Sequence, residues 1–390
     1  MFKEFLDLGR HPIANAFLKK EDFDDEFFFN LKVCWDGESK LVSIKNFVEP
    51  ERIFNEDYPY NTSNSFPMII HFKNIAEWLK NEFKPKTVLE IGSNDGSFIK
   101  NFDKETSICV EPCSNFAKIT SDMGYRSYTT FWDTDVSLGI KEIHGEMDLI
   151  YAANCICHIH DLDDTFKAVK NLLSKDGVFV FEDPSLLKIL ERNSYDQIYD
   201  EHPHIFSVTA LDNLLKRNGL TVFRVDNLSV HGGSNRIYAS RDRSVELSVR
   251  ENLQREDDFG LNEFKTYRDF TKRVEKSRND LVELLVKLKN DGKRVMSIGA
   301  TAKSTTVFNY CKIGIDLVEL ITDTTRDKQG KYSPGSHIPV VSRKSVNLND
   351  YDYVYLGAWN FKDVIIDIES EFVKNGGKFI THVPEVMVFS

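Results

Sequence analysis

Long hydrophobic segments are absent from this chain of 390 residues. The longest apolar runs, such as residues 178–181, have the length of a buried strand and are far too short to span a bilayer. Residues 1–5 contain no apolar core of signal-peptide length. We therefore expect a cytoplasmic protein that does not enter the membrane.

Basic tracts and metal-binding cysteine pairs are also missing. The net charge is −11 and no basic stretch offsets it, which argues against nucleic acid as a partner. The six cysteines include the closely spaced pairs Cys109/Cys113 and Cys155/Cys157, but no second pair follows at zinc-finger spacing. We interpret them as reduced cysteines and predict no metal site.

The chain has no internal repeat or low-complexity segment either. Its length suggests two or three domains rather than one core. Residues 1–70 are predicted to form a small, mostly loop-like α+β lobe. Within it we expect a strand at 27–33 and a hairpin turn at Asp36–Gly37, because Asp-Gly pairs favour tight turns.

Residues 71–245 alternate strand and helix patterns, an order typical of a parallel sheet with helices on both faces. The expected elements are a helix at 70–83, strands at 87–91, 107–110, 148–152 and 177–181, and a terminal antiparallel pair near 220–225 and 236–240. The middle of the chain is therefore predicted to be a Rossmann-like α/β domain.

Residues 246–390 predict a second, smaller α/β domain. It should begin with a long amphipathic helix at 261–290, whose apolar stripe is a packing face. The expected strands follow at 294–298, 317–322, 353–356 and 378–382.

The most informative motif is a glycine turn, Glu90-x-Gly92-Ser-x-x-Gly96, directly after the strand expected at 87–91. In Rossmann-type units the first glycine lets the backbone turn against a ligand. An acidic residue about 20 positions on then binds the ribose of an adenosine cofactor. Glu111 holds that position. An ordinary strand-to-helix turn is the alternative.

Nothing in this motif builds a pyrophosphate cradle, which favours S-adenosylmethionine over a dinucleotide. Asp95 is expected to bind the amino group of the cofactor and Glu111 its ribose. The predicted cofactor-binding residues are Glu90, Gly92, Asn94, Asp95, Gly96, Glu111, Pro112 and, after the strand at 148–152, Asn154.

The densest polar cluster is residues 195–204, whose tyrosines, carboxylates and histidines are not expected in a buried core segment. His202 could act as a general base near neutral pH, with Glu201 or a tyrosine orienting it. Metal ligation by His202, His204 and Glu201 is one alternative, and a solvated loop is another. His158 is ambiguous between an active-site wall and the surface.

Two further turns are candidates for substrate contact. At 299–306 a small-residue turn places Lys303 and the hydroxyls after it at an expected helix N-terminus, where phosphate is favoured. This turn lacks Walker spacing, and an ordinary turn is the alternative. A polar glycine turn at 231–236 could bring backbone close to a substrate, and the aromatic segment 58–63 could cover the site.

Taken together, these segments resemble the sugar C-methyltransferases of bacterial deoxysugar pathways. The shared motifs run in order along nearly the whole chain: Asp7-Leu8-Gly9, Pro12-Ile13-Ala14-Asn15, 58–65, 90–96, Tyr199-x-Glu201-His202, His231-Gly232-Gly233-Ser234, 328–335 and Ala358-Trp359-Asn360-Phe361. The resemblance implies a three-part enzyme that uses S-adenosylmethionine on nucleotide-linked 4-keto-6-deoxy sugars. It also implies that Tyr60, Tyr199 and His202 line the active site, with the histidine as the base.

The chain departs from this family at its start. Family members usually begin with two Cys-x-x-Cys pairs that bind a structural zinc. The first pair is absent, and of the second only Cys34 remains, with Gly37 in the place of its partner. We expect an amino-terminal lobe that has lost the zinc site and holds together by packing.

These observations predict methyl transfer to C-3 of a nucleotide-linked 4-keto-6-deoxy sugar. His202 would be the base, Glu201 would orient it, and Tyr199 and Tyr60 would position the sugar. The carboxy-terminal domain, 246–390, would help to bind the nucleotide. The predicted substrate-binding residues are His231, Gly232, Ser234, Asn235, Lys303, Ser304, Lys328, Tyr332 and Asn360.

The substrate would be a dTDP- or GDP-sugar, bound by a monomer or weak dimer in a deoxysugar pathway for bacterial polysaccharide. A second departure from the family, Pro203-His204 after the catalytic histidine, leaves the acceptor atom open. O-methylation of a nucleotide-sugar hydroxyl is therefore the nearest alternative. A non-catalytic protein that binds nucleotide sugar or S-adenosylmethionine, and a Rossmann dehydrogenase, are the others.

Overall fold

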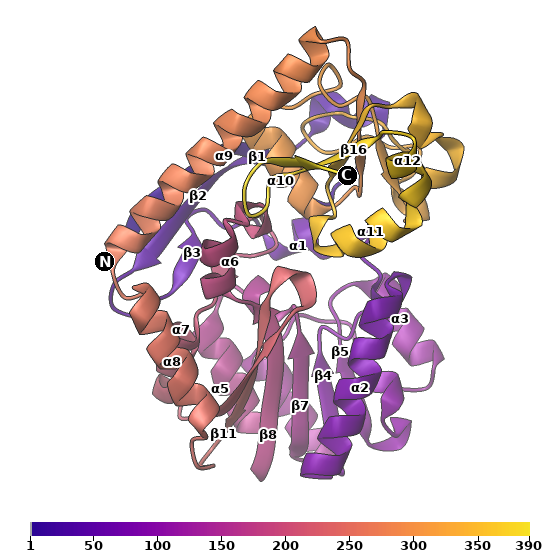
Figure 1. Cartoon of the computed structure of the whole chain (residues 1–390). Helices are drawn as coiled ribbons and strands as arrows, with labels where there is room; N and C mark the ends of the chain where they lie inside the picture. The colour runs from indigo at the N-terminus through magenta and orange to yellow at the C-terminus, as the bar shows by residue number, and fades with distance from the viewer. Residues whose placement is uncertain (1) are drawn as a thin grey trace.

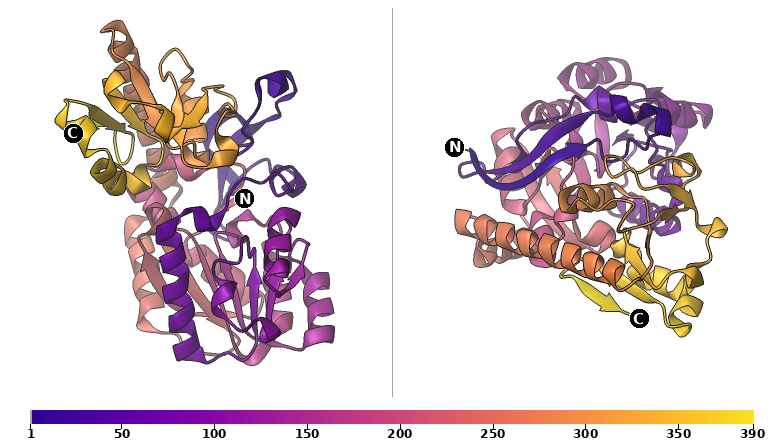
Figure 2. Two further views of the ribbon diagram at one scale, coloured as in Figure 1. Left: turned by 90° about the vertical axis from the view of Figure 1, so that its right-hand side faces the viewer. Right: turned by 90° about the horizontal axis from the view of Figure 1, so that it is seen from above.

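Three β-sheets organise the chain, and the computed structural model describes them over residues 2–390 (Figure 1). The amino-terminal lobe and the carboxy-terminal domain lie together on one side of the central domain (Figure 2). No helix among the described residues is both long and apolar enough to cross a membrane.

The amino-terminal lobe is an antiparallel sheet of four strands: β1 (Phe2–Pro12), β2 (Phe28–Asp36), β3 (Val42–Ile44) and β9 (His204–Ile205). The strand expected at 27–33 and the turn after it are confirmed, since β2 and β3 pair antiparallel. The loop-like prediction is wrong for β1. Register shifts between Glu4 and Leu6 and between Asp7 and Gly9 break the two-residue alternation that would mark it as a strand.

The central domain is a seven-stranded sheet in the order β10-β11-β8-β7-β4-β5-β6. Its strands are β4 (Val88–Ile91), β5 (Ser107–Val110), β6 (Arg126–Tyr128), β7 (Met147–Ala153), β8 (Leu173–Pro184), β10 (Thr221–Leu228) and β11 (Ser234–Ser240). Its helices, with the short α1 that precedes them, are α1 (Pro50–Ile53), α2 (Phe66–Phe83), α3 (Ser114–Asp122), α4 (Thr134–His144), α5 (Leu162–Leu172), α6 (Leu186–Arg192) and α7 (Val208–Arg217).

Helices cover both faces of this sheet, as the sequence pattern predicts. Phe179 and Phe181 of β8 pack in one core cluster with helices α4, α5 and α7. Val178 and Val180, which alternate with them, pack in a second cluster with α2. The expected antiparallel pair is also present, because β11 runs antiparallel to both β8 and β10.

The carboxy-terminal domain is a six-stranded sheet in the order β14-β13-β12-β15-β16-β17. Its strands are β12 (Val295–Ile298), β13 (Ile321–Asp323), β14 (Val340–Ser342), β15 (Tyr353–Leu356), β16 (Lys378–Thr381) and β17 (Met387–Phe389). Its helices are α9 (Phe264–Asn290), α10 (Ala302–Cys311), α11 (Lys362–Ile368) and α12 (Ser370–Lys374). Helix α8 (Leu247–Phe259) precedes them and packs on the central domain, where Val249 joins the core cluster.

Two expected boundaries in this domain are wrong. The long helix starts at Phe264 rather than at 261, because Gly260 adopts a left-handed φ of 85° and ends α8. The strand expected at 317–322 starts only at Ile321, since Leu317 and Val318 both hydrogen-bond back to Gly314 in a turn.

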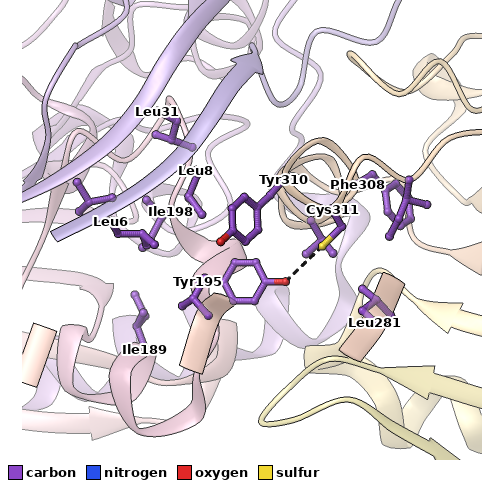
Figure 3. Packing of buried hydrophobic residues seen from close by; sticks show 14 of the residues in the cluster. Leu6, Leu8, Leu31, Ile189, Tyr195, Ile198, Leu281, Phe308, Tyr310 and Cys311 are labelled. Carbon is purple, nitrogen blue, oxygen red and sulfur yellow. Dashed lines mark hydrogen bonds between the residues drawn. The ribbon is translucent and has the colours of Figure 1, made fainter. Parts of the chain in front are cut away.

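The amino-terminal lobe and the carboxy-terminal domain share one hydrophobic core (Figure 3). Leu6 and Leu8 of β1 belong to the same cluster as Phe308 and Tyr310 of α10. Tyr195 is fully buried among them, and its hydroxyl lies 3.8 Å from the Cys311 Sγ. Helix α9 runs beside β1 and β2 and joins this core. These two parts therefore pack as one body above the central sheet.

Candidate active site

A cavity of about 800 Å³ lies where the three parts of the chain meet. Its walls include Asn15 and Tyr60 from the amino-terminal lobe, Gly92 from the central domain, and Lys303 and Asn360 from the carboxy-terminal domain. The strand order of each α/β sheet reverses beside its first strand, β4 or β12, which is where such folds bind ligands. This volume is near the upper end for small-molecule sites and suits two ligands.

The structure brings most of the predicted site residues to this cavity. The predicted residues that line it are Tyr60, Glu90, Gly92, Asn94, Glu111, Pro112, Asn154, Tyr199, Glu201, His202, His231, Lys303, Lys328 and Asn360. The predicted residues that do not line it are Asp95, Gly96, Gly232, Ser234, Asn235, Ser304 and Tyr332.

Asp95, which is predicted to bind the amino group of the cofactor, does not line the cavity and has other contacts. One carboxylate oxygen of Asp95 accepts the backbone N–H of Ser63 at 2.7 Å. The other accepts the backbone N–H and the hydroxyl of Ser97. Asp95 therefore fastens the 62–64 turn to the first glycine turn, and Gly96 packs against Thr120 behind it.

Glu111 joins the glycine turn to the end of β5. The Gly92 N–H donates to the Val110 carbonyl at 2.8 Å and holds the turn against that strand. The Glu111 carboxylate accepts the N–H of Asn94 at 2.7 Å and the N–H of Cys113 at 2.9 Å. Burial raises the pKa of Glu111. Each carboxylate oxygen keeps a further lone pair, which a ribose hydroxyl could fill.

The carboxy-terminal domain repeats this construction around Asp323. The Gly299 N–H donates to the Thr322 carbonyl at 2.8 Å. The Asp323 carboxylate accepts the N–H of Ala300 at 2.7 Å and the N–H of Thr325 at 2.7 Å. Gly92 and Gly299 have left-handed φ values, 69° and 99°. Glu111 directly follows β5, and Asp323 is the last residue of β13. The cavity therefore has two glycine turns with the same construction, Gly92 with Glu111 and Gly299 with Asp323, which resemble the nucleoside-binding turns of Rossmann folds (nucleoside-type turns).

Sequence reasoning missed Asp323, although a signal was present. The residue ends a short strand 24 positions after Gly299, close to the spacing between Gly92 and Glu111. The strand expected at 317–322 places Asp323 directly after it, as the strand at 107–110 places Glu111, so the sequence already indicated this acid.

Segment 195–204 is buried, so the expectation that it lies outside the core is wrong. Each of its carboxylates accepts a hydrogen bond from another part of the chain. Asp196 accepts the indole N–H of Trp359 at 2.5 Å, and Asp200 accepts the N–H of Ala14 at 2.8 Å. Because these partners are distant in sequence, the polar composition looked like that of a loop. The segment instead joins the domains.

His202 is held in one tautomer. Its Nδ1 lies 2.8 Å from the Gln197 carbonyl, which only accepts, so Nδ1 carries the proton and Nε2 is left as an acceptor. Burial and the nearby Lys303 lower the pKa of His202 to about 4. The Tyr199 ring lies 4.2 Å away and the His158 ring 5.3 Å away, centroid to centroid.

Glu201 does not orient His202, contrary to the prediction. Its carboxylate accepts the Asn15 side-chain N–H at 2.5 Å and the Tyr58 hydroxyl at 2.9 Å. Asn15 in turn accepts from Lys328 at 3.4 Å. Glu201 therefore ties the amino-terminal lobe to the cavity wall.

His204 cannot share a metal with His202 in this arrangement. Its Nδ1 lies 2.8 Å from the Ser43 hydroxyl, and its Nε2 donates to the His160 carbonyl at 3.1 Å. Both ring nitrogens are thus used in packing β9 against its neighbours.

The predicted substrate residues that miss the cavity have structural roles. The Ser304 hydroxyl and Thr301 form a capping box at the start of α10. Tyr332 exchanges two backbone hydrogen bonds with Leu18 and docks the amino-terminal lobe. Gly232 packs too closely against Trp359 to carry a side chain.

Ser234 and Asn235 are buried in β11 and miss the cavity as well. The Ser234 hydroxyl donates to the Val230 carbonyl, and the Asn235 amide donates to the Ser185 hydroxyl. Neighbouring His231 does line the cavity, and its Nε2 has no hydrogen-bond partner among the described residues. Among the residues predicted in this turn, only His231 lines the cavity and can contact a ligand.

Comparison with known proteins agrees with this architecture. Residues 69–225 match a family described as "Methyltransferase domain", and residues 229–384 match "C-methyltransferase C-terminal domain". C-methyltransferase NovU of Streptomyces niveus is 33% identical over 401 residues, covering 99% of this chain and 94% of NovU. The chain belongs to the C-methyltransferase family. It is an S-adenosylmethionine-dependent methyltransferase with a Rossmann-like central domain.

Solved structures resemble part of the chain only. The PH0226 protein of Pyrococcus horikoshii is 15% identical and covers 50% of this chain and 100% of its own, with a TM-score of 0.35. Magnesium protoporphyrin IX methyltransferase of Synechocystis, solved with bound SAH, is 13% identical and covers 46% of this chain and 88% of its own, with a TM-score of 0.33. Identities and TM-scores this low say nothing about the substrate.

Residues 1–54 match a family named for zinc binding, but their side chains do not fit a zinc ion. This stretch contains one cysteine, Cys34, and one histidine, His11. Both are buried, and the His11 Nε2 lies 3.0 Å from the Leu8 carbonyl. A structural zinc takes four thiolate or imidazole ligands, which these two residues cannot supply.

Proposed function

We propose that this enzyme transfers a methyl group to C-3 of a nucleotide-linked 4-keto-6-deoxy sugar, with His202 removing the C-3 proton. One observation carries the proposal. A buried imidazole with a free Nε2 lines a cavity that also contains two nucleoside-type turns, at Glu111 and at Asp323. One turn suits the adenosine of the cofactor, and the other suits a nucleotide on the substrate.

The carboxy-terminal turn has the features that a nucleoside diphosphate requires. Asp323 offers lone pairs to a ribose, as Glu111 does in the central domain. Helix α10 starts at the cavity, and the partial positive charge of its N-terminus favours phosphate. Lys303 lies in its first turn, and Lys328 donates to the carbonyl of Ala300 just before the helix, so two cations line this part of the cavity. We propose that residues 246–390 bind the nucleotide and that residues 1–70 cover the sugar.

The proposed chemistry needs a base, a donor to the ketone and exclusion of water. The His202 Nε2 takes the C-3 proton, and the C–H electrons move into the bond to C-4, which gives an enolate. Burial raises the pKa of Tyr199 well above its usual value, so its hydroxyl stays protonated and can donate to the C-4 oxygen. The Gly92 turn and Glu111 would hold S-adenosylmethionine, whose sulfonium would supply the methyl group that C-3 takes as the carbon–sulfur bond breaks.

Proton exchange at C-3 tests this proposal directly. With S-adenosylhomocysteine filling the cofactor site, the enzyme should exchange the C-3 proton of a dTDP- or GDP-linked 4-keto-6-deoxy hexose for deuterium in D2O. The His202→Ala variant should exchange at least about 100-fold more slowly, because general-base catalysis is worth that much. NMR of the recovered sugar measures the label.

Two results would count against the proposal. Exchange at C-5 alone would indicate that C-5, and not C-3, accepts the methyl group. A product that carries a methoxy group, with no exchange at any carbon, would support O-methylation instead.

We also propose that the amino-terminal lobe contains no zinc. If so, Cys34→Ser should leave the metal content of the purified protein unchanged, as measured by elemental analysis. Loss of one equivalent of zinc in this variant would contradict the proposal, whatever metal is bound elsewhere in the chain.

A further inference from the structure

Three potential metal ligands meet beside the cavity. Cys157 and His158 lie in the 3-10 helix that follows β7 (Ile156–His158), and His202 lies in the segment that joins the domains. One ligand atom from each lies within 4.8 Å of the other two. The Cys157 thiol is buried behind the cavity wall, whereas His158 and His202 both line the cavity.

This set of atoms suits a thiophilic divalent cation. Zn²⁺ binds thiolate at about 2.3 Å and imidazole at about 2.0–2.1 Å, which brings tetrahedral ligands to about 3.5 Å of one another. The Cys157 and His158 side chains would have to rotate to shorten the distances between the ligand atoms from at most 4.8 Å to about 3.5 Å. Three protein ligands leave a fourth position open, and that position would face the cavity.

A buried carboxylate, Asp183, lies next to the cluster. Asp183 is the last residue but one of β8, it is 3% exposed, and its carboxylate is hydrogen-bonded by the Cys157 thiol. Burying a carboxylate costs free energy, and a cation nearby offsets part of that cost. Asp183 is also placed to take the thiol proton when the sulfur becomes a ligand.

We propose that Cys157, His158 and His202 form a site for Zn²⁺ or a similar thiophilic cation, and that its occupation reversibly blocks methyl transfer. The Cys157 S–H bond breaks, its proton leaves through Asp183 to solvent, and a metal–sulfur bond forms. The His202 Nε2 gives its lone pair to the metal and is then unavailable to a C-3 proton. Inhibition rests on the proposed role of His202, whereas binding does not.

Binding is tested without substrate, by titrating the metal-free protein with Co²⁺. The intact protein should bind one equivalent with a near-ultraviolet band from thiolate-to-cobalt charge transfer. Cys157→Ser should lose the band, because serine keeps a hydroxyl for Asp183 but is a poor ligand. The matched control Cys155→Ser changes a thiol two residues away and should keep it. Absence of the band from the intact protein, or its persistence in Cys157→Ser, overturns the site.

Inhibition is tested by turnover with Zn²⁺. At ten times the dissociation constant, turnover of the intact protein should fall about tenfold and recover on adding a chelator. Cys157→Ser should keep its basal turnover and resist the same Zn²⁺ concentration. Cobalt binding without zinc inhibition, or activation by the metal, would overturn the blocking role while leaving the site in place. A protein with no turnover at all would instead contradict the proposed function.

Discussion

Replacing His202 with alanine should lower kcat by about 10²- to 10⁴-fold and leave the affinity for S-adenosylmethionine unchanged. The side chain offers its Nε2 to the cavity and makes no contact with the glycine turn of the cofactor site. Removing it therefore removes the proposed base and leaves the turn intact. Turnover is measured with a nucleotide-linked 4-keto sugar, and cofactor affinity by calorimetry.

The matched control is His204→Gln. His204 is also buried in this segment, but both of its ring nitrogens are engaged and it does not line the cavity. Its replacement should lower the melting temperature with little change in kcat. Full turnover in the His202→Ala variant would remove this residue from the mechanism. Absence of turnover from both the intact protein and the variant would favour a binding protein without catalysis.

Features with local signals were predictable from the sequence. The strand at 88–91, the turn at Gly92 and the acid at Glu111 lie within 24 residues, and each is marked by its own residue type. Periodicity likewise located most parallel strands of both α/β sheets, but not the short edge strands β6 and β14. Two bulges in β1 removed that periodicity, so a strand of 11 residues was read as loop.

Features that depend on distant partners were not predictable. Asp95 has the position of a ligand-binding carboxylate, but Ser63, 32 residues earlier, occupies it. Glu201 stands next to the proposed base, yet Asn15, 186 residues away, holds its carboxylate. A single sequence does not reveal which partners hold a buried acid, or whether the acid lines the cavity, as Glu111 does and Asp95 does not.

The two acids at the nucleoside-type turns should have separable effects. Glu111→Ala should weaken S-adenosylmethionine binding by about 10- to 100-fold and leave the affinity for the nucleoside diphosphate unchanged, and Asp323→Ala should do the reverse. The magnitude follows from hydrogen bonds to a charged acceptor, worth about 1.5–3 kcal/mol. Calorimetry with S-adenosylhomocysteine and with dTDP or GDP measures both affinities on each variant.

Each variant serves as the control for the other, because both acids also hold their own turns. Each carboxylate accepts two backbone N–H groups, so either replacement should cost stability to a similar degree. A general loss of structure would weaken both ligands in both variants. If Glu111→Ala loses affinity only for S-adenosylhomocysteine and Asp323→Ala only for the nucleoside diphosphate, the cavity must contain two separate nucleoside sites. If Asp323→Ala binds the nucleotide normally, the second turn is structural and the nucleotide must be held elsewhere.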